Sequence, residues 1–476
     1  MSYTPKAVGA GYGFEFILWC IENLKKAFLI PVPLAITTMY FLNLGVFWFI
    51  IFYPLWLVTP FALLICYLLL SSWTHDRHET EVIPWETVMK INDAELASQF
   101  KGQKLPMETA IEAYFDLKAD FLEEDNLIEV LKNKNKIFRF GLTKSQVNFF
   151  FREFLNQITG HSREQDHREV GDVYNRGNDF YNWFLGDTMV YTSGMWQKPE
   201  DTLRIAQFRK LDTIASYIQL KEGDEHLDIG CGWGTLIRYY AKKYGSKSAG
   251  CTLAEEQVKW GMDLAEKEGV QNKIEYFCCD YRLIPSKNGN KKYDKITCLE
   301  MAEHVGIKNF TSFLLQVNDM LKDDGIFYLQ IAGLRRYWHW EDLIWGLFMD
   351  RYIFPGADNS CPLANTVSHL ERAGFEVHRV ENMGVHYSRT IEAWYYNWIS
   401  NKNKVIEKYG KWWYRIWSIF LSWSTIIARQ GSSTVFMITC NKNTRNDKSS
   451  VGKEEGKNMF ARLDRWIGPN VVASQQ

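Results

Sequence analysis

A glycine-rich turn is the clearest chemical signal in this sequence of 476 residues. The run Leu227-Asp228-Ile229-Gly230-Cys231-Gly232-Trp233-Gly234 lies between an expected strand and an expected helix at 235–243. Glycines at such a turn let the backbone approach a ligand closely. Two carboxylates, Asp228 before the turn and Asp280 after the third expected strand, lie where a nucleoside would bind. The pattern therefore predicts a site for a nucleoside-containing cofactor.

Three interpretations of this turn remain open on the residues alone. A nicotinamide cofactor usually requires an Asp or Glu at the end of the second strand, where it binds the ribose diol. This sequence has Gly250-Cys251-Thr252 at that place instead. A methyl-donor site is the interpretation we favour, and a Rossmann-like domain that binds no nucleotide is the third.

The elements that would position this turn alternate between strands and helices from residue 166 to residue 440. Expected strands at 226–230, 248–252, 274–279, 293–299, 325–331, 375–380 and 434–440 indicate an α/β, Rossmann-like domain with a mixed seven-stranded sheet. Two helical insertions, 333–362 and 384–430, are rich in Trp and Tyr. Two interpretations of these insertions remain open: a cover that faces lipid, or part of the protein core.

The N-terminal part of the chain has a different character. No Asp, Glu, Lys or Arg occurs from Ala27 to Thr74, a length that suits two bilayer crossings of about 20 residues each. We expect crossings at Pro33–Phe52 and Leu55–Trp73 with the turn at Tyr53-Pro54, which makes a transmembrane helical hairpin. Its ends would share one side of the membrane, and the flanking bases favour the cytosolic side: Lys25, Lys26 and Arg77.

The remaining segments complete the expected organisation. Residues 1–30 would be cytosolic, 31–74 would hold the hairpin, 75–165 would form a helical connecting region, and 441–476 a polar tail. An apolar run that begins this late and lasts this long does not fit a cleaved signal peptide. No residue pattern predicts an oligomeric state.

Bulk composition excludes several classes of function. Lys and Arg number 55 against 56 Asp and Glu, so no basic footprint for nucleic acid is present. The nine cysteines have no CxxC spacing and the ten histidines no HxxxH or HExxH run, so we predict reduced thiols and no metal site. An aromatic content of 15%, with 19 Trp, suits a large apolar ligand or a membrane interface.

Several motifs resemble the cyclopropane-fatty-acid synthase family of S-adenosylmethionine-dependent methyltransferases, also called mycolic acid cyclopropane synthase-like. Besides the glycine turn they are Arg176-Gly177-Asn178-Asp179-Phe180-Tyr181, Tyr191-Thr192-Ser193, Asp280-Tyr281-Arg282, Glu303-His304-Val305-Gly306 and Ala393-Trp394-Tyr395. They fall in the family's order and spacing over nearly all of residues 173–440. Within the family, residues 299–306, 342–348 and 352–358 are similar to the sphingolipid 9-methyltransferases, which carry an N-terminal transmembrane pair. The resemblance implies a class I methyltransferase fold.

The resemblance also implies which residues contact the cofactor, S-adenosyl-L-methionine. They form four groups along the chain: Tyr191 and Thr192; His226, Leu227, Asp228, Ile229, Gly230, Cys231, Gly232, Trp233 and Gly234; Thr252, Leu253, Ala254, Glu255, Glu256 and Gln257; Tyr281 and Arg282.

The implied chemistry is methylation of a lipid double bond. An alkene is a weak nucleophile, so it must be held against the methyl group in a dry site where aromatic rings and a carboxylate such as Glu303 stabilise the cation. In cyclopropane synthases a bound bicarbonate takes a proton from the new methyl group, and its pocket maps here onto Ser193, Glu303, Gln330 and Tyr395, with a further family cysteine at Ser424. Ser193 and Gln330 replace a cysteine and a histidine. We therefore expect a methyl-branched alkene in place of a ring.

The expected substrate is a sphingolipid, ceramide or glucosylceramide, methylated at carbon 9 of the sphingoid base. The expected location is the endoplasmic reticulum membrane, with the catalytic domain on the cytosolic side. Two alternatives remain open: a cyclopropane or branched fatty acid synthase that acts on phospholipid acyl chains, and a degenerate methyltransferase fold that binds lipid without catalysis.

Overall fold

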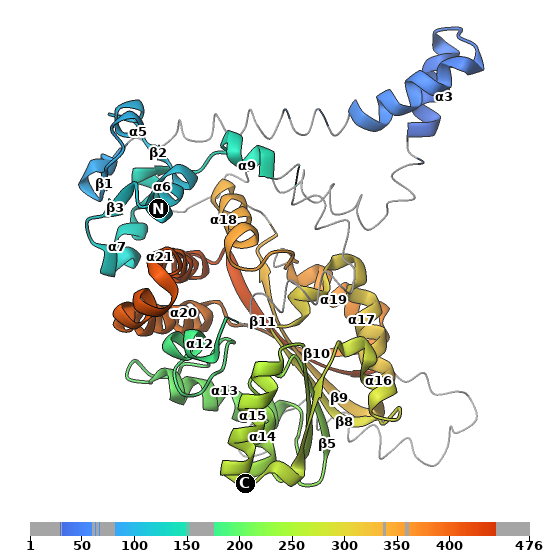
Figure 1. The fold of residues 1–476 in the computed structure, drawn as a ribbon. Coiled ribbons are helices and arrows are strands. Elements are labelled where there is room, and N and C mark those ends of the chain that lie inside the picture. The colour runs from blue at the N-terminus through green and yellow to red at the C-terminus, as the bar shows by residue number, and fades with distance from the viewer. Residues whose placement is uncertain are drawn as a thin grey trace, which may run out of the picture. The chain divides into compact units, whose positions relative to one another are not determined.

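The computed structural model describes residues 31–59, 81–149, 176–336, 339–357 and 361–443, together with Leu29, Ala62, Cys66 and Arg152. The chain divides into two compact units that are interleaved along the sequence (Figure 1). The first unit takes its residues from 1–161, 335–355 and 409–423. The second takes them from 162–334, 356–408 and 424–476.

A seven-stranded sheet forms the centre of the second unit, in the order β10-β11-β9-β8-β5-β6-β7. Neighbouring strands are parallel along the run β9-β8-β5-β6-β7, whereas β11 is antiparallel to both β9 and β10. The predicted mixed seven-stranded sheet is therefore confirmed. The strands are β5 (Glu225–Ile229), β6 (Lys247–Thr252), β7 (Ile274–Cys278), β8 (Tyr293–Leu299), β9 (Leu321–Leu334), β10 (Phe375–Asn382) and β11 (Ser433–Lys442).

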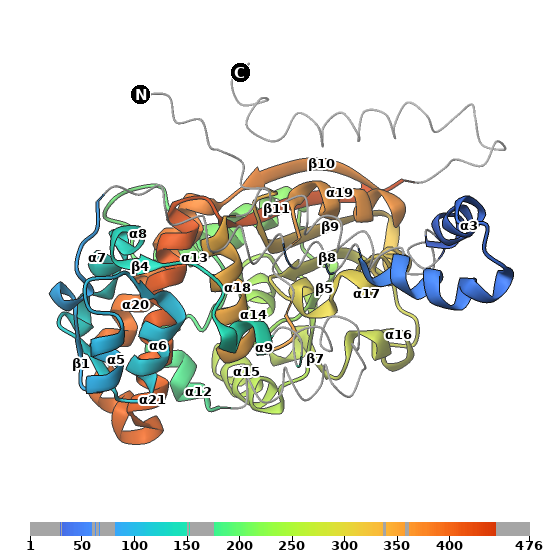
Figure 2. The same cartoon turned by 90° about the horizontal axis from the view of Figure 1, so that it is seen from above.

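Helices cover both faces of this sheet, as Figures 1 and 2 show. Side chains alternate along β9, so that Phe327 and Leu329 pack toward one face and Ile326 and Tyr328 toward the other. The first face is covered by α17 (Ile307–Met320) and α19 (Leu363–Arg372), the second by α13 (Leu203–Tyr217) and α14 (Thr235–Lys243). The unit also contains α12 (Asn178–Leu185), α15 (Glu255–Glu268), α16 (Ile284–Lys287), η8 (Ala302–Val305) and α20 (Gly384–Ser400).

The first unit combines short helices with two small sheets. Strands β1 (Met89–Ile91) and β3 (Ala119–Phe121) pair antiparallel, and β2 (Leu105–Pro106) pairs parallel with β4 (Phe138–Arg139). The helices are α5 (Ala94–Gln99), α6 (Met107–Phe115), α7 (Leu127–Lys132), α8 (Lys134–Ile137), α9 (Lys144–Phe149) and α18 (Trp340–Tyr352), with residues 409–423 of α21 (Lys402–Arg429). The region expected to be a helical connection thus contains strands as well.

A buried arginine organises the core of this unit. Arg415 is fully buried, and its guanidinium lies 4.2 Å from the ring centroid of Tyr114. It donates to the carboxylate of Asp120 and lies 3.4 Å from Glu124 Oε1. Because a buried cation is costly without a partner, these two carboxylates hold Arg415, and with it α21, against the β3 region.

Most of the aromatic side chains in the two insertions are buried. Trp340, Trp417 and Trp423 are 0% exposed in the first unit, as is Trp398 in the second. Large rings enclosed by protein cannot face lipid, so the core interpretation holds for these residues and the lipid-facing cover is wrong for them.

The N-terminal helices differ from the expected crossings. Helix α3 (Pro31–Phe41) ends early, residues 42–45 turn, and residues 49–59 are helical again. The turn therefore lies before the predicted Tyr53-Pro54. The chain reverses at Asn43, which adopts φ 53°, a left-handed conformation that asparagine tolerates. The two helices are joined by a hydrogen bond of 2.9 Å from Trp56 Nε1 to Thr38 Oγ1.

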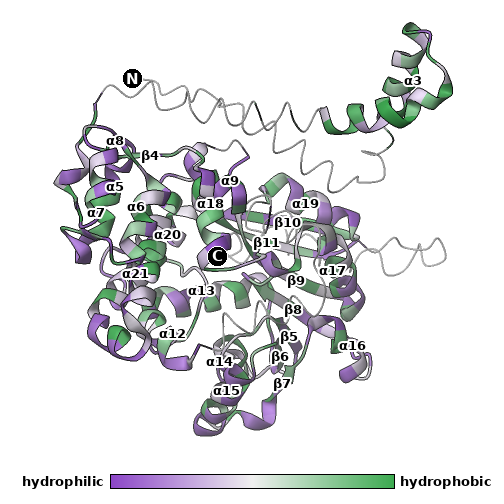
Figure 3. Ribbon diagram, turned by 45° about the horizontal axis from the view of Figure 1, so that its top comes forward, coloured by the Kyte–Doolittle hydropathy of each residue, from purple (hydrophilic) through white to green (hydrophobic). Residues whose placement is uncertain are grey.

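This segment is apolar along both helices (Figure 3). Among the described residues, none of the helices has both the length and the hydropathy needed to cross a bilayer. The expected first crossing, Pro33–Phe52, is interrupted by the turn, and most of the expected second crossing lies outside the described residues.

Candidate active site

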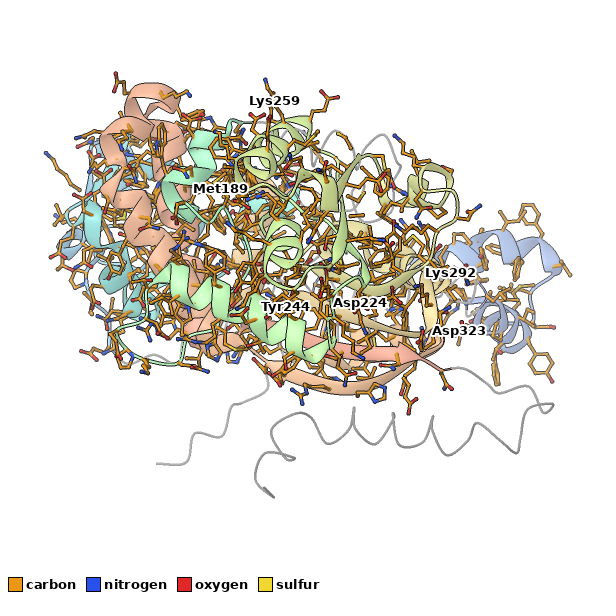
Figure 4. The ribbon with its side chains drawn as sticks, turned by 90° about the horizontal axis from the view of Figure 1, so that it is seen from below. Met189, Asp224, Tyr244, Lys259, Lys292 and Asp323 are labelled. Carbon is orange, nitrogen blue, oxygen red and sulfur yellow. The ribbon has the colours of Figure 1, made fainter. Side chains whose placement is uncertain are left out.

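A cavity opens in the second unit at the carboxyl ends of β5, β6, β7 and β8, the edge at which parallel sheets usually bind ligands. Met189, labelled in Figure 4, lines it from the segment after α12, and Thr235 lines it from the start of α14. Tyr244, also labelled, follows the other end of that helix.

The glycine turn forms one wall of this cavity. Gly230, Gly232 and Gly234 have φ of 84°, 53° and 72°, a region that favours glycine. The amides of Gly230 and Cys231 both donate to Cys251 O at 2.9 Å, which fixes the turn against β6. A Cβ on Gly232 would meet nothing within 4 Å, so backbone there faces open space. The turn thus fits the close approach of a nucleoside cofactor.

Thirteen of the predicted cofactor contacts line the cavity: Tyr191, Thr192, Asp228, Ile229, Gly230, Cys231, Gly232, Trp233, Thr252, Leu253, Gln257, Tyr281 and Arg282. The other six do not. His226 is fully buried between Ser248 and Thr297, Leu227 is in the core, Gly234 begins α14, and Ala254–Glu256 form the start of α15.

Side-chain hydrogen bonds fix the shape of this wall. Thr252 Oγ1 donates to Gln257 Oε1 at 2.7 Å, and Trp233 Nε1 donates to Asn178 Oδ1 at 2.7 Å. Arg282 holds the carboxylate of Asp280 with its Nε at 2.8 Å and its Nη2 at 2.5 Å. That carboxylate is therefore already neutralised by a neighbouring cation.

The five predicted catalytic residues are all buried in the second unit, but none lines the main cavity: Ser193, Glu303, Gln330, Tyr395 and Ser424. Two of them meet at one carboxylate, because the Ser193 amide donates at 2.8 Å and Gln330 Nε2 at 2.6 Å to Glu300 Oε1. Glu303 Oε1 instead accepts from the Ala332 amide at 2.5 Å and lines a smaller cavity beside Phe310. Their catalytic roles stay predictions.

The sequence analysis missed two charged residues of the main cavity, Glu300 and Lys210. Glu300 directly follows β8 with a left-handed φ of 50°. Lys210 is 0% exposed on α13 and donates to Thr192 Oγ1. The position of Glu300 directly after an apolar strand is the one sequence signal that could have drawn attention to it, whereas Lys210 lies in a helix of mixed composition.

Burial and mutual attraction set the protonation of this group. Burial lowers the pKa of Lys210 to about 8, although the carboxylates of Glu300 and Asp228 oppose the change. Burial raises the pKa of Asp228 to about 7, against a hydrogen bond from Thr297 and the charge of Lys210. Burial likewise raises the pKa of Glu300. The cavity thus holds a lysine whose pKa is lowered and two carboxyl groups whose pKa values are raised, of which Asp228 titrates near neutrality.

A bound bicarbonate does not fit these residues. Two donors at the positions mapped onto its pocket, the Ser193 amide and Gln330 Nε2, both serve the Glu300 carboxylate. A second anion at the same donors would meet a like charge in a buried site. We therefore assign no step to bicarbonate.

Comparison with known proteins adds the following. Residues 161–438 match the sequence model of the family described as "Mycolic acid cyclopropane synthetase". A sphingolipid C9-methyltransferase of Komagataella phaffii is 45% identical over 467 residues, which cover 95% of this chain and 94% of that protein. A sphingolipid C9-methyltransferase of Candida albicans is 48% identical over 347 residues, which cover 72% of this chain and 67% of that protein. The fold is similar to that of mycolic acid cyclopropane synthase CmaA1 complexed with SAH and CTAB, with a TM-score of 0.55 and 23% identity over 58% of this chain and 98% of that one.

Proposed function

The chain belongs to the mycolic acid cyclopropane synthetase family and, within it, to the sphingolipid C9-methyltransferases, and from this premise we propose that it transfers a methyl group from S-adenosyl-L-methionine to carbon 9 of a sphingoid base. The observation that carries the proposal is the 45% identity with a sphingolipid C9-methyltransferase over 95% of the chain. The cavity supports it, because the glycine turn and thirteen predicted cofactor contacts meet there.

The residues of the chain bind the reactants and exclude water. The cofactor, when bound, supplies an electrophilic methyl group on a positively charged sulfur. Backbone of the glycine turn would hold its nucleoside, and the hydrogen-bonded pair Thr252 and Gln257 shapes the wall of the cavity. The rings of Tyr191 and Trp233 line the cavity, and Trp394 packs on Tyr191 with centroids 5.3 Å apart. Such rings stabilise a nearby cation by about 1–2 kcal/mol each in a dry site.

We propose ceramide or glucosylceramide as the substrate and a methyl-branched alkene as the product. Membranes that contain the full chain would be incubated with methyl-labelled cofactor and a fungal lipid extract. The labelled lipid is expected to be a sphingolipid, with a methyl group on an intact double bond by mass spectrometry and NMR. Membranes that carry the Gly230→Ala variant are the matched control.

Other outcomes of this experiment would reject the proposal. Label in phospholipid acyl chains would indicate the alternative substrate class, and a cyclopropane ring would contradict the branched product. Absence of labelled lipid together with absence of cofactor binding would indicate a lipid-binding protein without catalysis.

We also propose that α3 and residues 49–59 form a membrane-embedded hairpin of an integral protein of the endoplasmic reticulum. Exposed side chains support this: Tyr40, Phe41, Val46, Phe47 and Ile50 are 67–84% exposed. Contiguous exposed apolar surface of this kind is costly in water. The amides of the turn are already paired, with Leu42 to Thr38 O and Leu44 to Met39 O at 2.9–3.0 Å, so hydrocarbon around the turn would leave these donors satisfied.

Alkaline extraction of membranes tests the hairpin. The double variant Phe47→Asp/Ile50→Lys is expected to release the chain into the soluble fraction, because charges in hydrocarbon are strongly disfavoured. Val82→Asp, an exposed apolar residue outside the charge-free run, is the matched control and should stay in the pellet. Full retention of the double variant would contradict the hairpin. A glycosylation acceptor placed after Asn443 should remain unmodified if the domain is cytosolic, and its glycosylation would place the domain in the lumen.

A further inference from the structure

The backbone at Glu300 is held in a conformation that L-residues rarely adopt. Its φ of 50° lies at the junction between β8 and η8, one residue beyond Leu299. A left-handed conformation costs a non-glycine residue about 1–2 kcal/mol. The Glu300 amide donates to Gln330 O at 2.7 Å, a short bond that keeps the residue in place. Strain of this kind persists at sites where a side chain must point in one direction.

The Glu300 carboxylate has an asymmetric environment. The Ser193 amide and Gln330 Nε2 both donate to Oε1, at 2.8 and 2.6 Å. Among the described residues, no donor lies within hydrogen-bond distance of the second oxygen, Oε2. Because Glu300 is half-buried and lines the cavity, its second oxygen remains available to a group bound there.

The carboxylate lies in the same cavity as the glycine turn. Met301, the next residue, contacts that turn so closely that a Cβ on Gly230 would lie 2.5 Å from Met301 Cβ. Glu303, by contrast, does not line this cavity, and its Oε1 accepts from the Ala332 amide. Of the two carboxylates in the segment 299–306, Glu300 is therefore the one placed to reach a reacting lipid.

We propose that Glu300 is the general base that takes the proton from the lipid carbon that accepts the methyl group; this inference rests on the proposed function. When C9 is methylated, the π electrons of the alkene form the new carbon–carbon bond and the methyl–sulfur bond breaks. Positive charge then lies on C8. Glu300 Oε2 accepts the proton from C9, and the electrons of the C9–H bond restore the C8–C9 double bond. The proton leaves the carboxyl group to water after the product departs.

The surroundings of Glu300 suit this role. Its burial raises its pKa, which makes the carboxylate a stronger base than an exposed one. The hydrogen bonds from Ser193 and Gln330 and the charge of Lys210 oppose that effect and favour the ionised form. The two hydrogen bonds on Oε1 fix the orientation of the side chain, as a positioned base requires.

Three substitutions separate a base from a carboxylate that only holds Ser193 and Gln330 in place. Glu300→Gln keeps an oxygen acceptor for both donors but cannot take a proton. Glu300→Gly removes the side chain and relaxes the backbone, because glycine adopts positive φ without strain. Glu275→Gln, at an exposed carboxylate on β7 of the same sheet, is the matched control.

The assay is methyl transfer by the full chain in membranes, with kcat, KM and cofactor affinity measured for each variant. Glu300→Gln should lower kcat at least 100-fold with both KM values within threefold of wild type, and Glu275→Gln should change neither. Formate, acetate or bicarbonate should restore the activity of Glu300→Gly at least tenfold, because each supplies a carboxylate to the vacated space. Those salts should not restore Glu300→Gln, whose side chain fills it.

Two results would overturn the inference: a kcat of Glu300→Gln within threefold of wild type, or no rescue of Glu300→Gly by any of the three anions. The wild-type product separates this test from that of the proposed function. If wild type labels a lipid other than a sphingolipid, the proposed substrate is wrong, and the variants are then compared on the lipid that is labelled.

Discussion

Replacing Lys210 by methionine tests how the cavity balances its charges. The side chain is 0% exposed, and Glu300 and Asp228 are the carboxylates that favour its charged form. Methionine has a similar length and fits irregular cores, so the change removes the charge with little change in packing. Lys242→Met, at an exposed position on α14, is the control.

The size of the effect follows from two opposing contributions. A pKa of about 8 for Lys210, against an ordinary lysine value of about 10.4, means that the folded protein disfavours its charged form by about 3 kcal/mol, carboxylates included. Loss of the cation leaves buried carboxylates uncompensated, which typically costs about 3–5 kcal/mol while they are ionised. Below the pKa of Asp228, about 7, that carboxyl group is protonated and the second cost shrinks. We therefore expect near-equal stabilities at pH 6 and a less stable variant at pH 8.

Asp228 sets the direction of the pH dependence. Asp228 has a raised pKa, so the folded state holds a proton that the unfolded state has released, and stability falls as pH rises until about 7 in the wild type. Without Lys210 the pKa of Asp228 rises further, so the variant continues to lose stability above pH 7, by about 1.4 kcal/mol per pH unit. Because both proteins lose stability alike below pH 7, the gap between wild type and variant should grow by about 1 kcal/mol between pH 7 and pH 8.

Urea titration of the purified full chain, read by hydrogen exchange of peptides from α13 and β5, measures this gap within the second unit. It avoids the assumption that both units unfold together. A difference that is the same at pH 6 and pH 8, or that equals the difference given by Lys242→Met, would refute the reasoning.

Two further predictions concern the glycine turn and the first unit. Gly230→Ala should weaken cofactor binding at least tenfold by calorimetry, because its Cβ would lie 2.5 Å from Met301 Cβ. The control is Gly269→Ala, at a glycine that also has a positive φ, 71°, but has open space around it, and this variant should bind the cofactor as wild type does. Equal affinities for the two variants would count against a steric cause. Burial raises the pKa of Glu108 to about 8, so this group contributes a fall in wild-type stability as pH rises from about 4.5 to 8, and Glu108→Gln should remove that contribution. Parallel pH profiles in urea unfolding would contradict this assignment.

The parts of the fold that could be predicted depend on local patterns. The alternation of strand-like and helix-like segments predicted the seven strands, and Gly230, Gly232 and Gly234 indicated a turn that needs positive φ. These features are local because a few consecutive residues determine them. The resemblance then placed Tyr191 and Gln257, far apart in sequence, on the wall of one cavity.

What could not be predicted depends on contacts between distant residues or on backbone angles. Sequence does not reveal a left-handed glutamate, so the predicted site includes Glu303, which lines a smaller cavity, and not Glu300, which lines the main one. Lys210 lies in an ordinary helix and becomes notable only because the sheet covers it. The turn of the hairpin is predicted at Tyr53-Pro54, whereas the structure places it at residues 42–45, where the positive φ of Asn43 is visible only in the backbone.

The interleaving of the two units has a consequence for the order in which the protein can be completed on the ribosome. The first unit includes residues 409–423, so Asp120 and Glu124 are synthesised long before Arg415, the buried cation that they surround. Strand β11, in the interior of the sheet between β9 and β10, is made later still. Neither unit can therefore finish folding while the C-terminal fifth of the chain is still in the exit tunnel or being translated, and the nascent N-terminal half must remain incompletely packed until then.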